Sequence, residues 1–229
     1  MGERTLGRAL KGIRQPTATG LPSDAGRAAA VAIAVVCGLV IAAQGVWIRR
    51  GMETGWLDTT VDAHLRASLG AHHLLLDVLV WPGEPVPAAA ITAALVLACA
   101  VRRRYRQAVL AAVSVPLADA LTELVLKPLI GRTSWGNPFP SGHVAYVAAL
   151  VTVLIVLLAR TGTGARPLFR VALGLTALLI TAAVAAGVIG AGMHHFSDTV
   201  GGAAVGIGTV LVTALILDQL IRTRSERPQ

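Results

Sequence analysis

The chain has 229 residues, of which 55% are hydrophobic and only 14% are charged, and its mean hydropathy is +0.69. This composition excludes an ordinary soluble domain and predicts an all-α, polytopic membrane protein. The formal net charge of +8 does not indicate a nucleic-acid partner, because the basic residues are distributed as membrane topology requires.

Six apolar runs approach the length of about 20 residues that a helix needs to span a bilayer. We expect spans at residues 28–48, 85–101, 107–126, 142–159, 168–190 and 199–221. The second span is short, and it either begins at Pro85 or includes His72–Trp81 with a break at Pro82. Cys37 and Cys99 lie inside apolar runs, so we expect small core residues there and not a disulfide.

The basic residues predict how these spans are oriented. If the N-terminus is cytoplasmic, fifteen of the twenty Lys and Arg residues fall in cytoplasmic segments and five fall outside. This asymmetry favours six transmembrane helices in a multi-pass cell-membrane protein with both termini in the cytoplasm. We expect a cytoplasmic arm at 1–27, a six-helix membrane domain at 28–221 and a cytoplasmic tail at 222–229.

The longest outer connection, residues 49–71, contains Asp58, Asp62 and His64. The spacing of these polar residues predicts an amphipathic helix that lies on the membrane surface.

Three features inside the spans have two interpretations each. Gly202 and Gly206 form a GxxxG pattern, which favours close packing within this chain over a dimer seam. Glu123 lies one turn before Lys127, and we expect the two side chains to pair. Asp119 is an acid inside a span, and it is either a functional group or a hydrogen-bonding group of the bundle.

Three polar segments lie at ends of the apolar runs, and the predicted topology brings all three to the outer face. They are Lys127–Arg132, Pro140–His143 and His194–Asp198. Together they hold a Lys, an Arg, a Ser-Gly pair, several His residues and an Asp, which are the groups that phosphoryl transfer through a histidine requires. The sequence therefore predicts one site assembled from three segments.

The first two segments supply groups that bind phosphate. Ser141 follows a proline and precedes a long apolar run, so we expect it to cap a helix whose free N–H groups face the ligand. Gly142 lets phosphate oxygens approach that backbone closely. Lys127 and Arg132 add positive charge for the same oxygens, and an arginine can bind them through two donors.

The third segment supplies the reacting histidine. His194 and Asp198 are four residues apart, across a loop-to-helix junction that we expect Ser197 to cap. A carboxylate on one imidazole nitrogen leaves the other nitrogen free to attack phosphorus. His143 lies across the phosphate cradle and is suited to protonate the leaving oxygen.

Over about residues 107–221 the chain resembles the type 2 phosphatidic acid phosphatase (PAP2) superfamily. Pro140-Ser-Gly-His143 matches the whole of that family's second motif, and His194-x-x-x-Asp198 matches the core of its third motif. The resemblance implies a PAP2-type helical bundle in which His194 is the nucleophile, Asp198 orients it and His143 is the acid. It also implies catalysis without a metal, usually on lipid phosphates at the outer leaflet.

Two motifs depart from the family's pattern. The first motif usually runs from a Lys through six residues to Arg-Pro, but counting from Lys127 those positions are Ser134 and Trp135. The third motif usually begins with Ser-Arg, where this chain has Gly187 and Val188. Two arginines that bind phosphate in the family are therefore missing here.

Other groups then have to supply the missing positive charge. Arg132 is the first candidate, and His195, Asn137 and Arg66 are further candidates for contacts with phosphate. An inactive relative that only binds or moves lipid is the alternative that the two missing arginines support.

The resemblance implies a metal-independent lipid-phosphate phosphohydrolase whose site faces outside. We expect a lipid phosphate and membrane lipids as partners, no nucleic acid and no cofactor, and the oligomeric state stays open. By analogy, a polyprenyl phosphate or diphosphate or a lipid-linked sugar phosphate of a cell envelope is slightly favoured as substrate. The alternatives are a phosphatidic acid or phosphatidylglycerophosphate phosphatase, a phosphotransferase and the non-catalytic relative. A zinc hydrolase is disfavoured, because the His spacing matches no zinc motif.

Overall fold

A computed structural model describes residues 24–51, 54–131, 139–158 and 167–225, and within these ranges the chain forms helices and no strand. Most of the arm expected at 1–27 lies outside them, as do Arg132 and Asn137. The elements are α2 (Asp24–Arg49), α3 (Trp56–Leu69), α4 (His73–Val80), the 3-10 turn η1 (Trp81–Gly83), α5 (Pro85–Val101), α6 (Tyr105–Ala120), the π-helical η2 (Leu121–Leu126), α7 (Lys127–Ile130), α8 (Gly142–Leu158), α9 (Pro167–Gly190) and α10 (Phe196–Ser225).

Four helices are long and apolar enough to cross a membrane: α2, the continuous run from α6 to α7, α9 and α10. The chain from α4 to α5 bends by 48° at its break, and taken together this pair makes a fifth candidate span. The break follows the 3-10 turn Trp81–Gly83, next to the proline at position 82 that predicts it. α8 has 17 residues, fewer than a typical span needs. The described residues thus form an all-helical polytopic protein with four or five candidate spans, and the sixth is not established.

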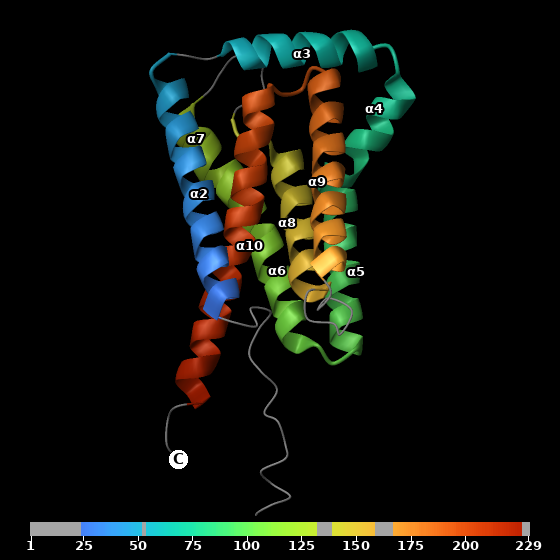
Figure 1. The fold of residues 1–229 in the computed structure, drawn as a ribbon. Coiled ribbons are helices and arrows are strands. Elements are labelled where there is room, and N and C mark those ends of the chain that lie inside the picture. Colours follow the sequence, from blue (N-terminus) through green and yellow to red (C-terminus); the bar gives the residue numbers. More distant parts are fainter. Residues whose placement is uncertain (1–23, 52–53, 132–138, 159–166, 226–229) are drawn as a thin grey trace, which may run out of the picture.

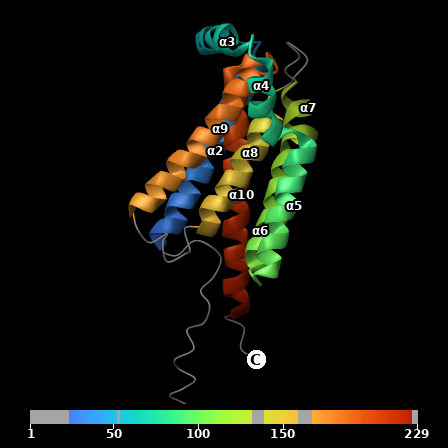
Figure 2. The same cartoon turned by 90° about the vertical axis from the view of Figure 1, so that its right-hand side faces the viewer.

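The helices run side by side, and α3 lies across one end of the bundle (Figure 1). The same end holds α7, the beginnings of α8 and α10 and the end of α9, whereas α2 begins and α10 ends at the opposite end (Figures 1 and 2). The described parts of the three polar segments singled out in the sequence therefore meet at one end of the bundle. This common location of the polar segments agrees with the sequence-based expectation that consecutive helices alternate in direction.

The centre of the bundle is the contact between α8 and α10. α8 is apolar and buried on most of its surface, between α6, α9 and α10. On α10, Gly202 faces the carbonyl of Ser141 and Gly206 faces the carbonyl of Ala145, with no room for a Cβ atom at either glycine. The GxxxG pattern therefore packs two helices of the same chain, as expected. Cys37 and Cys99 are buried and free, also as expected.

Candidate active site

His194 lies in the short connection between α9 and α10. Gly192 has a φ of +73°, a left-handed conformation that favours glycine and turns the chain back after α9. The backbone N–H of His194 then points to the carbonyl of Val188, at 3.3 Å. Its side chain is buried, and Nδ1 lies 3.4 Å from Oδ2 of Asp198. The structure therefore places the predicted His–Asp pair side by side, with Nδ1 on the carboxylate side of the ring, but Nδ1 makes no hydrogen bond within the described residues.

Asp198 also organises the first turn of α10. Its Oδ2 accepts a hydrogen bond from the backbone N–H of His195 at 2.9 Å, which is one half of a capping box. The expectation that the side chain of Ser197 caps this helix is wrong, because α10 already begins at Phe196 and Ser197 lies inside its first turn, where its hydroxyl donates to Asp58 of α3. At the start of α10, the carboxylate of Asp58, from a helix far away in the sequence, accepts the hydrogen bond from the backbone N–H of Ser197.

α8 begins opposite this loop. The carbonyl of Ser141 accepts from the N–H of Ala145, as the residue before a helix does, and its own N–H donates to the carbonyl of Asp198 at 3.0 Å. The hydroxyl of Ser141 is buried and has no hydrogen-bond partner among the described residues. The ring of His143 lies 6.5 Å from that of His194, measured between centroids, at an interplanar angle of 66°. The two histidines thus face one another across the start of α8.

The cation nearest to this helix start, within the described ranges, is Lys127. Its Nζ is paired with Oε1 of Glu123, as the sequence predicts. A Cβ atom added to Gly142 would lie 2.6 Å from Oε1 of Glu123 and 4.0 Å from Nζ of Lys127. The π-helical turn η2 carries Glu123 to this place, and such turns are frequent at functional sites. A carboxylate therefore lies where the N-terminus of α8 would receive an anion.

Sequence reasoning missed Glu84. Oε1 of Glu84 lies 3.3 Å from Nε2 of His143. The backbone just before α5 also contacts His143 closely, since a Cβ atom added to Gly83 would lie 2.8 Å from Cβ of His143. The prolines at 82 and 85 signalled the break but not its partner. Both candidate reacting histidines thus have a carboxylate neighbour.

The structure brings together six of the predicted site residues and separates one. His194, Asp198, His143, Ser141, Gly142 and Lys127 meet at the starts of α8 and α10. His195 is buried and directed to Asp62 of α3. Arg132 and Asn137 lie outside the described residues. Val188 is fully buried in a cluster of valines from α4, α8 and α9, so an arginine has no space there.

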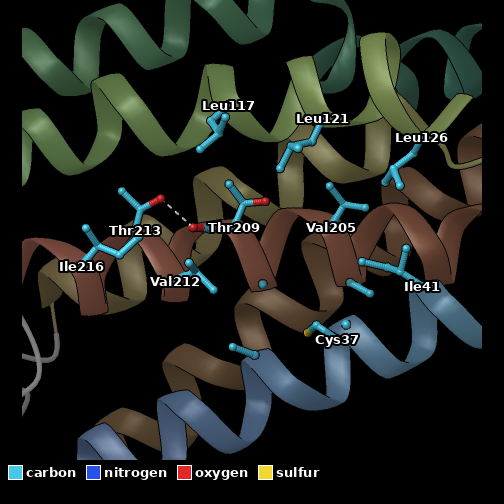
Figure 3. Close-up of a pocket in the computed structure, with 14 residues that line it drawn as sticks. Cys37, Ile41, Leu117, Leu121, Leu126, Val205, Thr209, Val212, Thr213 and Ile216 are labelled. Atoms are coloured by element: carbon cyan, nitrogen blue, oxygen red, sulfur yellow. Dashed lines mark hydrogen bonds between the residues drawn. The ribbon is translucent and has the colours of Figure 1, made fainter. Parts of the chain in front are cut away.

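An apolar groove of about 340 Å³ lies between α2, α6 and α10, and none of these histidines lines it. α10 forms its floor, and α2 and α6 with η2 form its walls (Figure 3). The hydroxyl of Thr213 donates its proton to the backbone carbonyl of Thr209, so that proton is not available to a ligand (Figure 3). Small residues such as Gly38 and Gly208 leave the space open.

No group of three or more His, Cys, Asp or Glu side chains converges as metal ligands do within the residues that the structure describes. The chemistry available here is that of two histidines with carboxylate neighbours, beside a helix N-terminus whose first N–H groups have no acceptor within the described residues.

The family model for the PAP2 superfamily matches residues 122–222. This match supports membership of the PAP2 superfamily, whose members are generally phosphatases that act on phosphate esters. The matched segment contains Lys127, His143, His194 and Asp198, and it excludes α3 and Glu84. No curated protein and no solved structure matches the chain.

Proposed function

We propose that this protein is a membrane lipid-phosphate phosphohydrolase that works through a phosphohistidine intermediate. The observation that carries the proposal is the pair of histidines, His194 and His143, which face each other 6.5 Å apart at the start of α8. Nδ1 of His194 faces Oδ2 of Asp198 at 3.4 Å, and we assign Nε2, on the other side of the ring, as the nucleophilic atom.

In the first step, Nε2 of His194 attacks phosphorus and a P–N bond forms as the bond from phosphorus to the leaving oxygen breaks. His143 donates a proton to that oxygen, so the lipid leaves as a neutral alcohol or, from a diphosphate, as a phosphate ester. Asp198 stabilises the positive charge that the ring of His194 acquires. In the second step, His143 takes a proton from water, the resulting hydroxyl attacks phosphorus, and the P–N bond breaks to release phosphate and restore His194.

The phosphate is held mainly by the beginning of α8. Within the described residues no acceptor pairs with the N–H groups of Gly142 and His143, and the hydroxyl of Ser141 is without a partner. Phosphate oxygens supply acceptors for all three groups. We assign the positive charge to Lys127 and to Arg132, with Asn137 as a further contact; His195 is directed to Asp62 and is not assigned to the phosphate.

We further propose that the chain crosses the membrane six times, with both termini in the cytoplasm and the site outside. The α4–α5 pair counts as one crossing. α8 is about 26 Å long at 1.5 Å per residue, and its neighbours cover it on most sides, so a short helix suffices. The placement of fifteen of the twenty basic residues supports this orientation.

The lipid part of the substrate is assigned to the groove on α10. The groove extends from Ala204 to Ile216 along α10, which is about 18 Å and close to the hydrocarbon thickness of one leaflet, about 15 Å. Leu126, at one end, directly precedes Lys127 in the chain. A single hydrocarbon chain, such as that of a polyprenyl phosphate or diphosphate or a lipid-linked sugar phosphate, suits an apolar groove of this length.

Phosphate release from a panel of lipid phosphates by the purified protein tests the activity. Release that continues with a chelator and stops with vanadate supports a metal-independent phosphohistidine enzyme. No release from any member of the panel contradicts the proposal. For orientation, a single cysteine at position 137 reacts with an impermeant thiol reagent outside intact cells, while one at 104 does not. The reverse pattern contradicts the topology.

A further inference from the structure

The N-terminus of α10, next to His194, is held by two carboxylates from α3. Asp58 accepts hydrogen bonds from the backbone N–H and the hydroxyl of Ser197, at 2.7 and 2.9 Å. Asp62 accepts from the N–H of Phe196 at 3.0 Å through Oδ1. Both carboxylates are 4% exposed, so two acidic side chains are buried where the positive end of the α10 dipole lies.

Asp62 also contacts the histidine that follows His194. Its Oδ2 lies 2.6 Å from Nδ1 of His195 and 3.6 Å from a terminal nitrogen of Arg66, one turn farther along α3. Arg66 in turn donates from Nε to the carbonyl of Ile189, in the last turn of α9, at 3.4 Å. α3 is therefore bonded to both helices that flank the connection carrying His194. A helix that merely rests on the membrane surface, as the sequence predicts, does not need these bonds.

These bonds also decide which helix N-terminus is open to a phosphate. The first N–H groups of α10, on Phe196 and Ser197, are already paired with carboxylates, and those carboxylates repel an anion. Within the described ranges the first N–H groups of α8 donate to no carboxylate, and the Glu123 carboxylate beside Gly142 is paired with Lys127. α8 is therefore the helix start left to receive the phosphate, while α3 fixes α10 as the support of His194.

His194 is bonded to its surroundings on both sides. Its own N–H donates to Val188 at the end of α9, and the next residue is held by Asp62. Misplacement of a reacting group by about 1 Å can cost on the order of a hundredfold in rate. A contact that sets the position of His195 therefore also sets the direction from which His194 attacks.

We propose that Asp62 is a positioning residue for the nucleophile, acting through His195, and that Asp58 supports it by holding the first turn of α10. This inference rests on the proposed function, because it concerns the rate at which His194 reacts. It extends the active site beyond the family-matching segment 122–222 to a helix that lies across the end of the bundle.

The test compares purified Asp62→Asn with Asp77→Asn, a matched control in which an exposed carboxylate of the neighbouring α4 is changed. For Asp62→Asn, kcat and the rate of phosphoenzyme formation should fall about ten- to hundredfold, while KM changes less than about threefold. A merely structural role would lower the amount of folded protein and leave these constants unchanged in what remains. Asp77→Asn should match the wild type.

His195→Asn tests the same contact from the other side. It should lower kcat by a similar factor, and the double variant should lose no more than the worse single variant, because both changes break one interaction. Wild-type kcat in folded Asp62→Asn or in His195→Asn overturns the inference, as do fully additive losses. If Asp62→Asn does not fold, the kcat of His195→Asn alone tests the inference.

Failure of the proposed function gives a different result. In that case the wild type itself releases no phosphate from any lipid phosphate. Hydrogen exchange of residues 194–199 then still tests the contact between α3 and α10, because exchange should be faster in Asp62→Asn and unchanged in Asp77→Asn. Unchanged exchange in Asp62→Asn contradicts the contact itself.

Discussion

Replacing Gly202 by alanine tests the contact that sets the distance between the two reacting histidines. A Cβ at this position would collide with the carbonyl oxygen of Ser141 and lie 3.2 Å from the N–H nitrogen of Ala145. Both obstacles are backbone atoms, so no side chain can move aside. α8 and α10 would have to separate by about 1 Å to restore an ordinary van der Waals contact.

The cost of this separation can be estimated for stability and for rate. Overpacking costs about 1–3 kcal/mol, and the better helix propensity of alanine returns about 0.8–1 kcal/mol, so we expect Gly202→Ala to lose about 0–2 kcal/mol of stability. The same shift moves His143 away from His194. A displacement of about 1 Å can cost on the order of a hundredfold in kcat, which is about 2.7 kcal/mol.

Thermal unfolding in detergent and phosphate release, measured on the same preparation, separate these two effects. Gly174→Ala in α9 is the matched control, because a Cβ there meets nothing within 4 Å. It should keep its activity and gain a little stability. If Gly202→Ala is as active as Gly174→Ala, close contact between α8 and α10 does not position the histidines.

Three further predictions concern charge, burial and the groove. Glu123→Gln should lower KM by about two- to fivefold in steady-state assays. The half-exposed ion pair between Glu123 and Lys127, worth up to about 1 kcal/mol, then no longer competes with phosphate for Lys127. A higher KM contradicts this. Val188→Arg should yield little folded protein in size-exclusion chromatography, because it buries an unpaired guanidinium in a fully buried apolar cluster. A folded, more active variant contradicts this. Gly38→Phe, which fills the groove where a Cβ meets no other atom, should raise KM severalfold for a long-chain lipid phosphate but not for a short-chain ester. Gly174→Phe is its control, and equal effects of the two substitutions would exclude the groove.

The local part of the site could be predicted from the sequence, because short spacings fix it. His194 and Asp198 are four residues apart, so they meet across a loop-to-helix junction whatever else surrounds them. Glu123 and Lys127 pair for the same reason. The meeting of His143 with His194 followed from topology alone, because helices that alternate in direction bring their polar ends to the same face.

The long-range partners could not be predicted in this way. Glu84 is separated from His143 by 59 residues and Asp62 from His195 by 133, and no spacing rule relates such positions. The prediction for Ser197 was wrong for a related reason. A serine at a helix start is a good cap, but a buried carboxylate is a stronger acceptor, and Asp58 was brought there only by the fold.

The number of spans shows a third limit. Hydropathy located the apolar runs well, yet α2 begins at Asp24 and α10 extends to Ser225, beyond the predicted bounds of 28 and 221. Helix ends that project past the apolar run are stabilised by backbone hydrogen bonds, which hydropathy does not measure. Conversely, α8 falls short of a full span, and whether it crosses depends on its neighbours more than on its own length.

The most direct test of the account is to find the residue that carries the phosphoryl group during turnover. The purified protein is mixed with a lipid phosphate labelled in its phosphate group, quenched within milliseconds in alkali, where phosphohistidine survives, and digested for mass spectrometry. We predict a phosphoryl group on His194, absent from His194→Ala and formed more slowly in His143→Ala. A label on another residue, or full turnover by His194→Ala, would contradict the central claim.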